Sequence, residues 1–288
     1  MSDALLAIRP RAEDVEGVTV LRALPSARCR SVGPFVFFDH MLGGDFAPGR
    51  GMNIRQHPHI GLSTLTYLLE GEVQHKDSLG SDQLVRPRDV SWMTAGRGVA
   101  HVERTPEHLL RSGSRLHGLQ VWLALPKAEE GRAPSYHHFP AEKLAESEAL
   151  GVRIRLIAGS GFCLESPVPV LSPTLFAELR LSAGATLALP AEHPERALYL
   201  LGGEALLDDE PLPLHEMVVL AEGESFTLGA CGDCQLMMIG GAPLDGPRRM
   251  NWNFVASDPA LIEDARRRWA AGEWPKVPGE VERIELPG

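Results

Sequence analysis

One six-residue segment occurs twice in the chain, and this repeat constrains the fold more than any other feature of the sequence. The segment Tyr67-Leu-Leu-Glu-Gly-Glu72 returns as Tyr199-Leu-Leu-Gly-Gly-Glu204, at an offset of 132 residues. Each copy follows a proline-containing approach and has a glycine turn between two strand-like runs. Repetition at a fixed spacing is typical of duplicated structural units, although two unrelated β-hairpins could share six residues. Duplication of one barrel is the more economical interpretation.

Short apolar or alternating runs, separated by glycine, proline and aspartate, make up most of the chain. Residues 66–74, 119–124 and 217–221 are examples. Such runs favour strands over helices, and the 29 glycines and 23 prolines supply the turns between them. The sequence therefore predicts an all-β protein of antiparallel sandwich or barrel type.

Two segments interrupt this pattern with helical signals. The clearer begins at residues 257–259, Ser-Asp-Pro, where an N-cap residue is followed by proline in the first turn. Leu261, Ala265 and Trp269 then share one face of the expected helix. A shorter helix is expected over residues 141–150.

The chain length of 288 residues suits two domains of ordinary size. The shorter helical segment lies where a boundary would fall. We expect one barrel in residues 1–140 and a second barrel, with the terminal helix, in residues 141–288.

The charge balance excludes several classes of partner. The chain has 28 basic against 38 acidic residues, a formal net charge of −10, which disfavours contact with phosphate backbones and anionic lipid. No apolar run is long enough to span a bilayer, and the opening residues lack the layout of a secretory signal peptide. We expect a cytoplasmic protein that binds neither nucleic acid nor membrane directly.

The four cysteines are too few for a disulfide scaffold in a chain of this length. Only Cys231 and Cys234 have a suggestive spacing, Cys-Gly-Asp-Cys. A redox or zinc site would need a thioredoxin-like strand and helix, or a second ligand pair, and neither is near. We interpret this segment as a structural turn.

Two pairs of potential metal ligands are each separated by a single residue: His57 and His59, then His101 and Glu103. Residues two apart in a strand point to the same face. A glycine-rich turn at residues 95–98 precedes the second pair and could bring two strands together across a barrel. One His-x-His pair among 11 histidines could lie on a solvated face by chance, but the second pair favours a three-histidine, one-glutamate metal site.

Imidazole and carboxylate ligands without thiolate suit iron, manganese, nickel, copper or zinc. Four ligands on one metal can leave one or two positions open for a water, dioxygen or a chelating enol. Glu103 can then act as ligand, general base or both. The affinity order of the first-row metals favours copper and nickel at almost any such site, so these residues do not determine the identity of the metal.

These residues also resemble known motifs. Residues 51–71, which hold the first histidine pair, look like the first cupin motif, and residues 87–101 look like the second. More narrowly, segments 33–40, 57–61 and 94–103 are similar to the signature segments of the pirin family. The resemblance covers the first 140 residues strongly and the remainder more weakly.

The resemblance implies two cupin barrels of the double-stranded β-helix or jelly-roll type, with a C-terminal α-helix. It implies one divalent metal, with Fe(II) expected first, on His57, His59, His101 and Glu103. Most cupins have a glutamate four or five residues after the second histidine, where this chain has Ser63 and Thr64. Pirins share that departure, and Glu103 would supply the carboxylate instead.

The activity that the resemblance implies is that of a quercetin 2,3-dioxygenase, acting on a flavonol or other enolic substrate with O2. Glu103 would accept the proton of the substrate hydroxyl. The alternative is a non-catalytic, iron-dependent redox sensor that regulates protein partners, since pirins are also known in that role. A monomer is expected in either case.

The other histidines receive no role from their spacing. The offset of 132 places Leu189 and Ala191 where the first barrel has its first histidine pair, so no metal is expected in the second barrel. A hydrogen bond or plain packing is expected for the histidine in the Phe-Phe-Asp-His segment. His193 and His215, in the second barrel, are interpreted as surface or packing residues. The remaining histidines are left unassigned: His75, His108, His117, His137 and His138.

Overall fold

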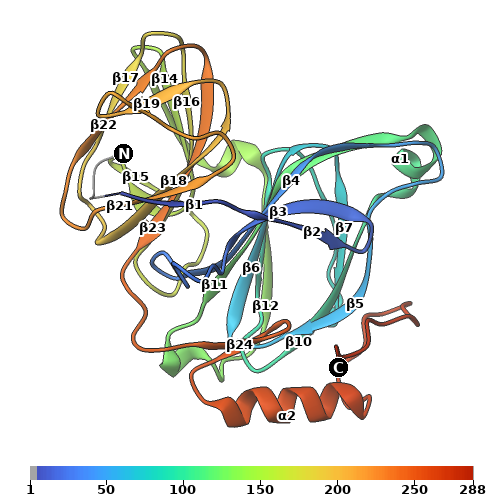
Figure 1. The fold of residues 1–288 in the computed structure, drawn as a ribbon. Coiled ribbons are helices and arrows are strands. Elements are labelled where there is room, and N and C mark those ends of the chain that lie inside the picture. Colours follow the sequence, from blue (N-terminus) through green and yellow to red (C-terminus); the bar gives the residue numbers. More distant parts are fainter. Residues whose placement is uncertain (1–4, 288) are drawn as a thin grey trace. The chain divides into compact units, whose positions relative to one another are not determined.

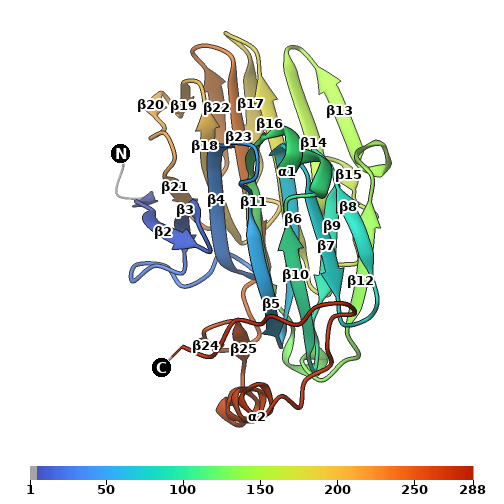
Figure 2. The same ribbon diagram turned by 90° about the vertical axis from the view of Figure 1, so that its right-hand side faces the viewer.

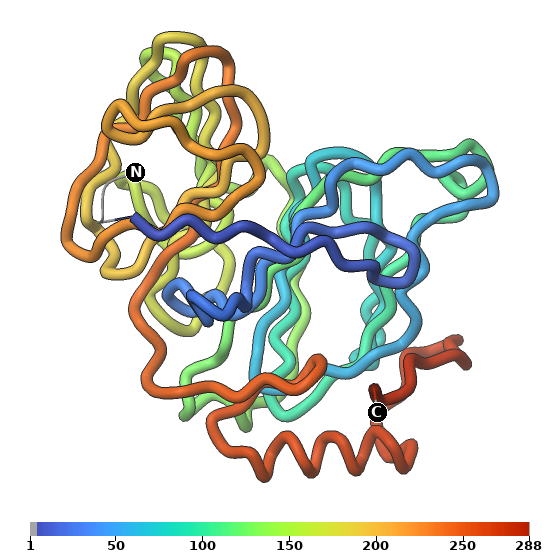
Figure 3. Tube along the Cα trace, viewed as in Figure 1, coloured from blue at the N-terminus to red at the C-terminus, as the bar shows by residue number. Residues whose placement is uncertain are grey.

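The computed structural model describes residues 5–287 and confirms the all-β prediction of two cupin barrels with a C-terminal α-helix. The chain forms two compact units, which we call the first and second barrels (Figure 1). The first barrel comprises residues 12–21, 38–141 and 244–287, and the second comprises residues 5–11, 22–37 and 142–243. The course of the chain can be followed in the Cα trace of Figure 3.

The first barrel is built on two antiparallel sheets. The larger has the order β12-β9-β6-β11-β4-β3-β2, with β2 Arg11–Val15, β3 Val18–Leu24, β4 Phe35–Phe46, β6 Leu62–Glu70, β9 Val90–Thr94, β11 Ser114–Ala124 and β12 Ser135–Phe139. The smaller has the order β5-β10-β7-β8, with β5 Asn53–His59, β7 Val73–Asp77, β8 Asp82–Val85 and β10 Val99–Arg104. Figure 2 shows β10 between β5 and β7. A short helix, α1 Glu107–Ser112, and a 3-10 turn at Lys127–Glu129 connect strands of this barrel.

The C-terminal segment belongs to the first barrel. It forms a small hairpin, β24 Arg249–Asn251 with β25 Phe254–Ala256, and the helix α2 Pro259–Ala270 (Figure 1). Val255 donates to Ile60 O at 3.2 Å, and the α2 side chains pack in one apolar cluster with Ala100 and Val102 of β10. This differs from the predicted division at residue 140, because long-range packing of this kind leaves no local signal in the sequence.

Helix α2 begins close to where the sequence predicts it. Asp258 is the N-cap, and its carboxylate accepts the Ala260 amide at 2.9 Å. Its buried residues are Ile262, Ala265 and Trp269, whereas Leu261 is 44% exposed. The predicted apolar face was therefore wrong by one residue at its first position. No helix in the described part of the chain is long and apolar enough to cross a lipid bilayer.

The second barrel repeats the same plan. Its larger sheet has the order β1-β21-β18-β23-β16-β14-β13, with β15 paired to β14; the bounds are β1 Leu6–Ile8, β13 Ala145–Ala149, β14 Val152–Gly161, β15 Leu164–Glu165, β16 Thr174–Leu181, β18 Glu195–Gly202, β21 Met217–Leu220 and β23 Cys234–Gly241. Its smaller sheet has the order β17-β22-β19-β20, with β17 Thr186–Leu189, β19 Ala205–Leu207, β20 Glu210–Pro211 and β22 Phe226–Ala230. Strand β1 joins this barrel rather than the first, because it pairs antiparallel with β21.

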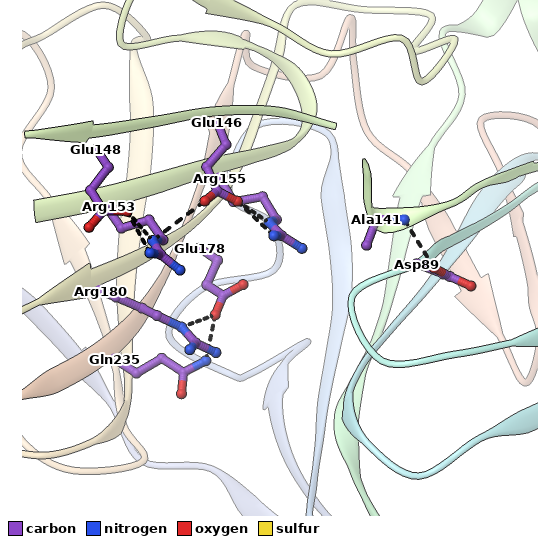
Figure 4. A network of polar contacts seen from close by, with 9 residues as sticks. All are labelled: Asp89, Ala141, Glu146, Glu148, Arg153, Arg155, Glu178, Arg180 and Gln235. Carbon is purple, nitrogen blue, oxygen red and sulfur yellow. Dashed lines mark hydrogen bonds and ion pairs between the residues drawn. The ribbon is translucent and has the colours of Figure 1, made fainter. Parts of the chain in front are cut away.

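The helix predicted over residues 141–150 is wrong. A 3-10 turn at Ala141–Lys143 leads into strand β13, and the Ala141 amide donates to Asp89 Oδ1 at 3.0 Å. Figure 4 shows the acidic side chains of β13 opposite arginines of β14. Arg155 pairs with Glu146 at 2.6 Å. Arg153 forms a second ion pair, with Glu148. Cross-strand charge pairing thus overrides the helical preference of alanine and glutamate.

Candidate metal centre

Strands β5 and β10 position the predicted ligands. They pair antiparallel with His101 opposite His57, so the two histidines of β5 and the histidine of β10 face the same interior. Gly61 ends this part of the chain with φ of +67°. A Cβ there would lie 1.9 Å from Val255 O, so the residue must be glycine for the C-terminal hairpin to close against the turn.

The structure brings three imidazoles together. Ligand nitrogens of His57, His59 and His101 all lie within 4.8 Å of one another, and all three residues are buried. The Nε2 atoms of His59 and His101 are 3.1 Å apart, and the ring centroids of His57 and His101 are 4.2 Å apart. Three ring nitrogens converging on one buried point form the donor set of a histidine-bound metal ion.

Hydrogen bonds at Nδ1 hold the rings of His57 and His59 in the orientation that turns Nε2 toward the centre. His57 Nδ1 lies 2.8 Å from Arg55 O, and His59 Nδ1 lies 3.2 Å from Asn253 O. A carbonyl oxygen can only accept, so each Nδ1 must carry the proton and each Nε2 keeps its lone pair for the centre. Asn253 lies between β24 and β25, so the C-terminal hairpin contributes directly to the site. Sequence reasoning missed this contribution.

Burial keeps these ligands in their neutral form. It lowers the pKa of His57 to about 4. Burial, and then repulsion from neighbouring histidines, lowers the pKa of His59 and His101 well below their usual range. A metal ion at neutral pH would therefore not have to displace protons from these imidazoles.

Glu103 lies in the same interior but outside the three-histidine group. The pairing of β10 with β5 shifts register between His101 and Glu103, which places Glu103 opposite Ile54 on β5. The Thr66 hydroxyl is 3.2 Å from Glu103 Oε1 and 2.7 Å from Gln120 Oε1. A hydroxyl has one proton, so it can donate to only one of these oxygens. Burial raises the pKa of Glu103, which makes it a stronger base than an exposed carboxylate.

One further histidine, left unassigned from the sequence, lies beside the cluster. His75 on β7 is 2% exposed, and its Nδ1 lies 3.4 Å from His101 Nδ1. Its Nε2 lies 3.2 Å from Asp77 Oδ2. The signal that could have found this pair is its spacing, because His75-Lys-Asp77 repeats the same-face, two-residue period of the ligand pairs.

Two aromatic side chains border the site. The ring of Trp122 on β11 lies edge-on to His59, with centroids 5.1 Å apart. Tyr136 on β12 stacks on His75, with centroids 4.3 Å apart and ring planes 15° apart. Met93 on β9 is fully buried and lies opposite Tyr136 in the sheet.

The other histidines contact groups outside the three-histidine cluster. His40 Nε2 lies 2.9 Å from His117 Nε2, and His138 Nε2 lies 2.9 Å from Asp89 Oδ2. In the second barrel, His193 and His215 each contact a backbone carbonyl through Nε2, at 2.8 and 3.0 Å respectively. His108 lies 2.9 Å from Glu72, and the ring of His137 stacks near Phe139.

The chain is similar to several known proteins along nearly its whole length. A family model described as Pirin matches residues 17–123, and one described as Pirin C-terminal cupin domain matches residues 176–275. A pirin-like protein of Caulobacter vibrioides is 45% identical over 265 residues, covering 91% of each chain. A Pseudomonas aeruginosa relative, provisionally named a quercetin 2,3-dioxygenase, is 35% identical and covers 89% of this chain and 80% of its own. A crystal structure of quercetin 2,3-dioxygenase from Acinetobacter baumannii matches with a TM-score of 0.91 and 32% identity, over 99% of this chain and 95% of that one.

Proposed function

This chain belongs to the pirin family, and we propose that its first barrel is the active site of a metal-dependent dioxygenase. The proposed substrates are O2 and a flavonol-like or other enolic molecule. The names of the Pseudomonas and Acinetobacter relatives support this activity. The proposed ligands are His57, His59, His101 and Glu103.

The convergence of three neutral imidazoles carries the proposal. Hydrogen bonds from Nδ1 to backbone carbonyls hold His57 and His59 with Nε2 toward the centre. Buried Nε2 lone pairs that face one another at these distances are costly unless an ion binds them. The donor set therefore fits a divalent metal, and nitrogen with carboxylate suits Fe(II), which is the metal of this proposal; nickel, copper, manganese and zinc would fit the same donors.

A bound metal would supply Lewis acidity toward the enol oxygen and an electron route to O2. The chain supplies the remaining functions. Glu103, with its pKa raised by burial, accepts the proton of the substrate hydroxyl and leaves an electron-rich enolate. The Thr66 hydroxyl, 3.2 Å from Glu103 Oε1, can hold that carboxylate in place when it donates there rather than to Gln120. Trp122, whose ring lies edge-on to His59, offers an apolar surface against which a planar substrate can be oriented.

The test combines metal analysis with turnover. Protein loaded anaerobically with Fe(II) is assayed for bound metal and for O2 consumption with quercetin. His57→Ala should lose metal and activity together, whereas Glu103→Gln should lose most activity because the amide cannot accept the proton. His193→Asn, in the second barrel, is the matched control and should retain both properties.

Each outcome separates the candidates. Stoichiometric metal without O2 consumption for any enolic substrate would rule out the dioxygenase and favour the metal-dependent regulator of protein partners. Absence of bound metal in the wild type would rule out the metal centre itself. Metal analysis of the same samples decides between Fe(II) and the other first-row ions.

A further inference from the structure

Strand β7 presents a second polar pair toward the three-histidine cluster. His75 and Asp77 are 2% and 0% exposed, and both lie in the strand that pairs with the other edge of β10. In that pairing Asp77 lies opposite His101, and His75 lies opposite Glu103. Burial of a charged group is costly unless the group is paired. The partners of the Asp77 carboxylate and the His75 imidazole therefore have to be identified.

The hydrogen bonds of Asp77 determine which of its partners donates. Oδ1 accepts the amides of Leu79 at 2.9 Å and Ser81 at 3.0 Å, which leaves Oδ2 for His75 Nε2 at 3.2 Å. Burial on its own would raise the pKa of Asp77, but the hydrogen bonds from His75 and Ser81 lower it overall. An ionised carboxylate can only accept, so His75 Nε2 carries a proton and donates.

The proton on Nε2 fixes the other side of the His75 ring. With a single proton on the ring, His75 Nδ1 has a lone pair, and it lies 3.4 Å from His101 Nδ1. His101 Nδ1 then donates, and His101 Nε2 keeps its lone pair at the point where it meets His59 Nε2, 3.1 Å away. The chain of donors therefore runs from His101 through His75 to Asp77.

Tyr136 holds the middle ring of this chain. Its ring stacks on His75 at 4.3 Å, and its hydroxyl lies 3.0 Å from Ser91 Oγ. Burial raises the pKa of Tyr136, so the phenol stays protonated. A stacked neighbour on one face and a carboxylate at Nε2 leave His75 little freedom to rotate away from His101.

We propose that His75 and Asp77 are positioning residues that orient His101 for the metal and set how tightly the site holds it. His57 and His59 donate to backbone carbonyls. His101 instead donates to the His75 ring, which in turn donates to the Asp77 carboxylate. His101 is therefore the most electron-rich ligand of the three. This inference rests on the proposed metal centre, and it adds a role for two residues outside the ligand set.

The test measures metal binding rather than turnover. Co(II) is titrated into metal-free protein against a competing chelator, and the visible ligand-field spectrum of the complex is recorded. His75→Phe keeps a ring for Tyr136 to stack on but removes both nitrogens, and Asp77→Asn removes the charge. Each should weaken Co(II) binding about 10- to 100-fold and shift the ligand-field bands. His75→Gln, whose amide oxygen can accept from His101, should recover part of the affinity.

A matched control comes from the same barrel. Half-buried His138 and buried Asp89 form a second histidine-aspartate pair, 2.9 Å apart, outside the strands that carry the three-histidine cluster. His138→Phe should leave Co(II) affinity and the spectrum unchanged. Circular dichroism and thermal unfolding of the metal-free variants show whether each one folds.

The outcomes distinguish this inference from the proposed function. If the wild type binds Co(II), and folded His75→Phe and Asp77→Asn bind it with the same affinity and spectrum, the positioning role is wrong while the metal centre stands. If the wild type binds neither Co(II) nor Fe(II), the metal centre fails and the positioning role with it. Nitrogen-15 NMR of the wild type needs no variant: a proton on His75 Nδ1 in place of Nε2 would overturn the proposed donor chain.

Discussion

The two barrels share one strand plan but have different interiors. The repeated segment begins at Tyr67 in β6 and at Tyr199 in β18, and each of these strands lies at a corresponding place in the larger sheet of its barrel. The second barrel is filled by one cluster of leucine, isoleucine, valine, methionine and other apolar side chains. The first barrel also has apolar clusters, but buried histidines and carboxylates lie in its interior beside them.

Strand pairing allows a position-by-position comparison of the smaller sheets. In the first barrel His57 on β5 lies opposite His101 on β10. In the second, Leu189 on β17 lies opposite Phe226 on β22, the corresponding pair of strands. Leu189 is fully buried in the apolar cluster. The same scaffold thus accommodates either two histidines of the candidate metal centre or two core residues at this place.

The neighbouring pair shows the same exchange. His75 on β7 lies opposite Glu103 on β10, and Leu207 on β19 lies opposite Leu228 on β22. Both leucines are buried in the second barrel's apolar cluster. His75 therefore belongs to a polar set in the first barrel that stands where the second barrel has apolar packing.

The largest expected effect comes from giving the first barrel an apolar residue at a ligand position. His101→Leu should reduce bound metal to background, because one of three converging nitrogens is lost. Elemental analysis of protein dialysed after metal loading measures this. His193→Asn in the second barrel should keep full metal content, and retained metal in His101→Leu would contradict the role of His101.

The sequence predicted the parts of this comparison that depend on local spacing. The two-residue period of His57 and His59, and of His101 and Glu103, indicated shared faces, and the strands put all four in one interior. His75 and Asp77 have the same two-residue period, but spacing does not tell which strands pair, so their place beside His101 could not be predicted. His75 contacts His101 only because β7 pairs with β10 in the folded chain. Asn253 contacts His59 only because the C-terminal hairpin folds against the first barrel.

Local propensity failed where tertiary pairing was stronger. Residues 145–149, Ala-Glu-Ser-Glu-Ala, favour a helix by composition, but arginines on β14 pair with both glutamates and hold them as an edge strand. The register shift after His101 could not be read from spacing either. It separates Glu103 from the three-histidine group, so a role for Glu103 as a permanent ligand stays a prediction.

A second expected effect concerns the apolar barrel alone. Leu228→Ala removes a fully buried side chain from the second barrel's core and should lower the free energy of unfolding by about 2–5 kcal/mol. Urea unfolding measures the loss. Metal content at low temperature should not change, since Leu228 lies in the barrel without the histidine cluster. A folded Leu228→Ala protein without metal would contradict the separation of packing and binding between the barrels.

A third effect is the acid sensitivity of the metal-free first barrel. Burial lowers the pKa of His57 from 6.5 to about 4, so the unfolded chain binds this proton more tightly than the folded one. Stability is therefore complete above pH 6.5 and is lost as the pH falls toward 4, by roughly 3 kcal/mol at most. Thermal unfolding of metal-free protein between pH 7.5 and 4 measures this loss. His57→Leu should flatten the curve in that window, and an unchanged slope would show that His57 does not titrate on unfolding.

The smallest expected effect concerns the buried carboxylate and has the opposite pH dependence. Burial raises the pKa of Glu103, so the folded protein binds this proton more tightly than the unfolded chain, and stability is lost as the pH rises above the unfolded value. Glu103→Gln cannot ionise, and at pH 7 it should stabilise the metal-free protein by about 1 kcal/mol. The difference should shrink as the pH falls below about 4, where the wild-type carboxyl is protonated in both states. With metal bound the order should reverse, because the cation then stabilises the carboxylate. Urea unfolding with and without metal tests both signs, and a metal-free variant that is less stable than the wild type at pH 7 would show that the carboxylate is well solvated or well paired there.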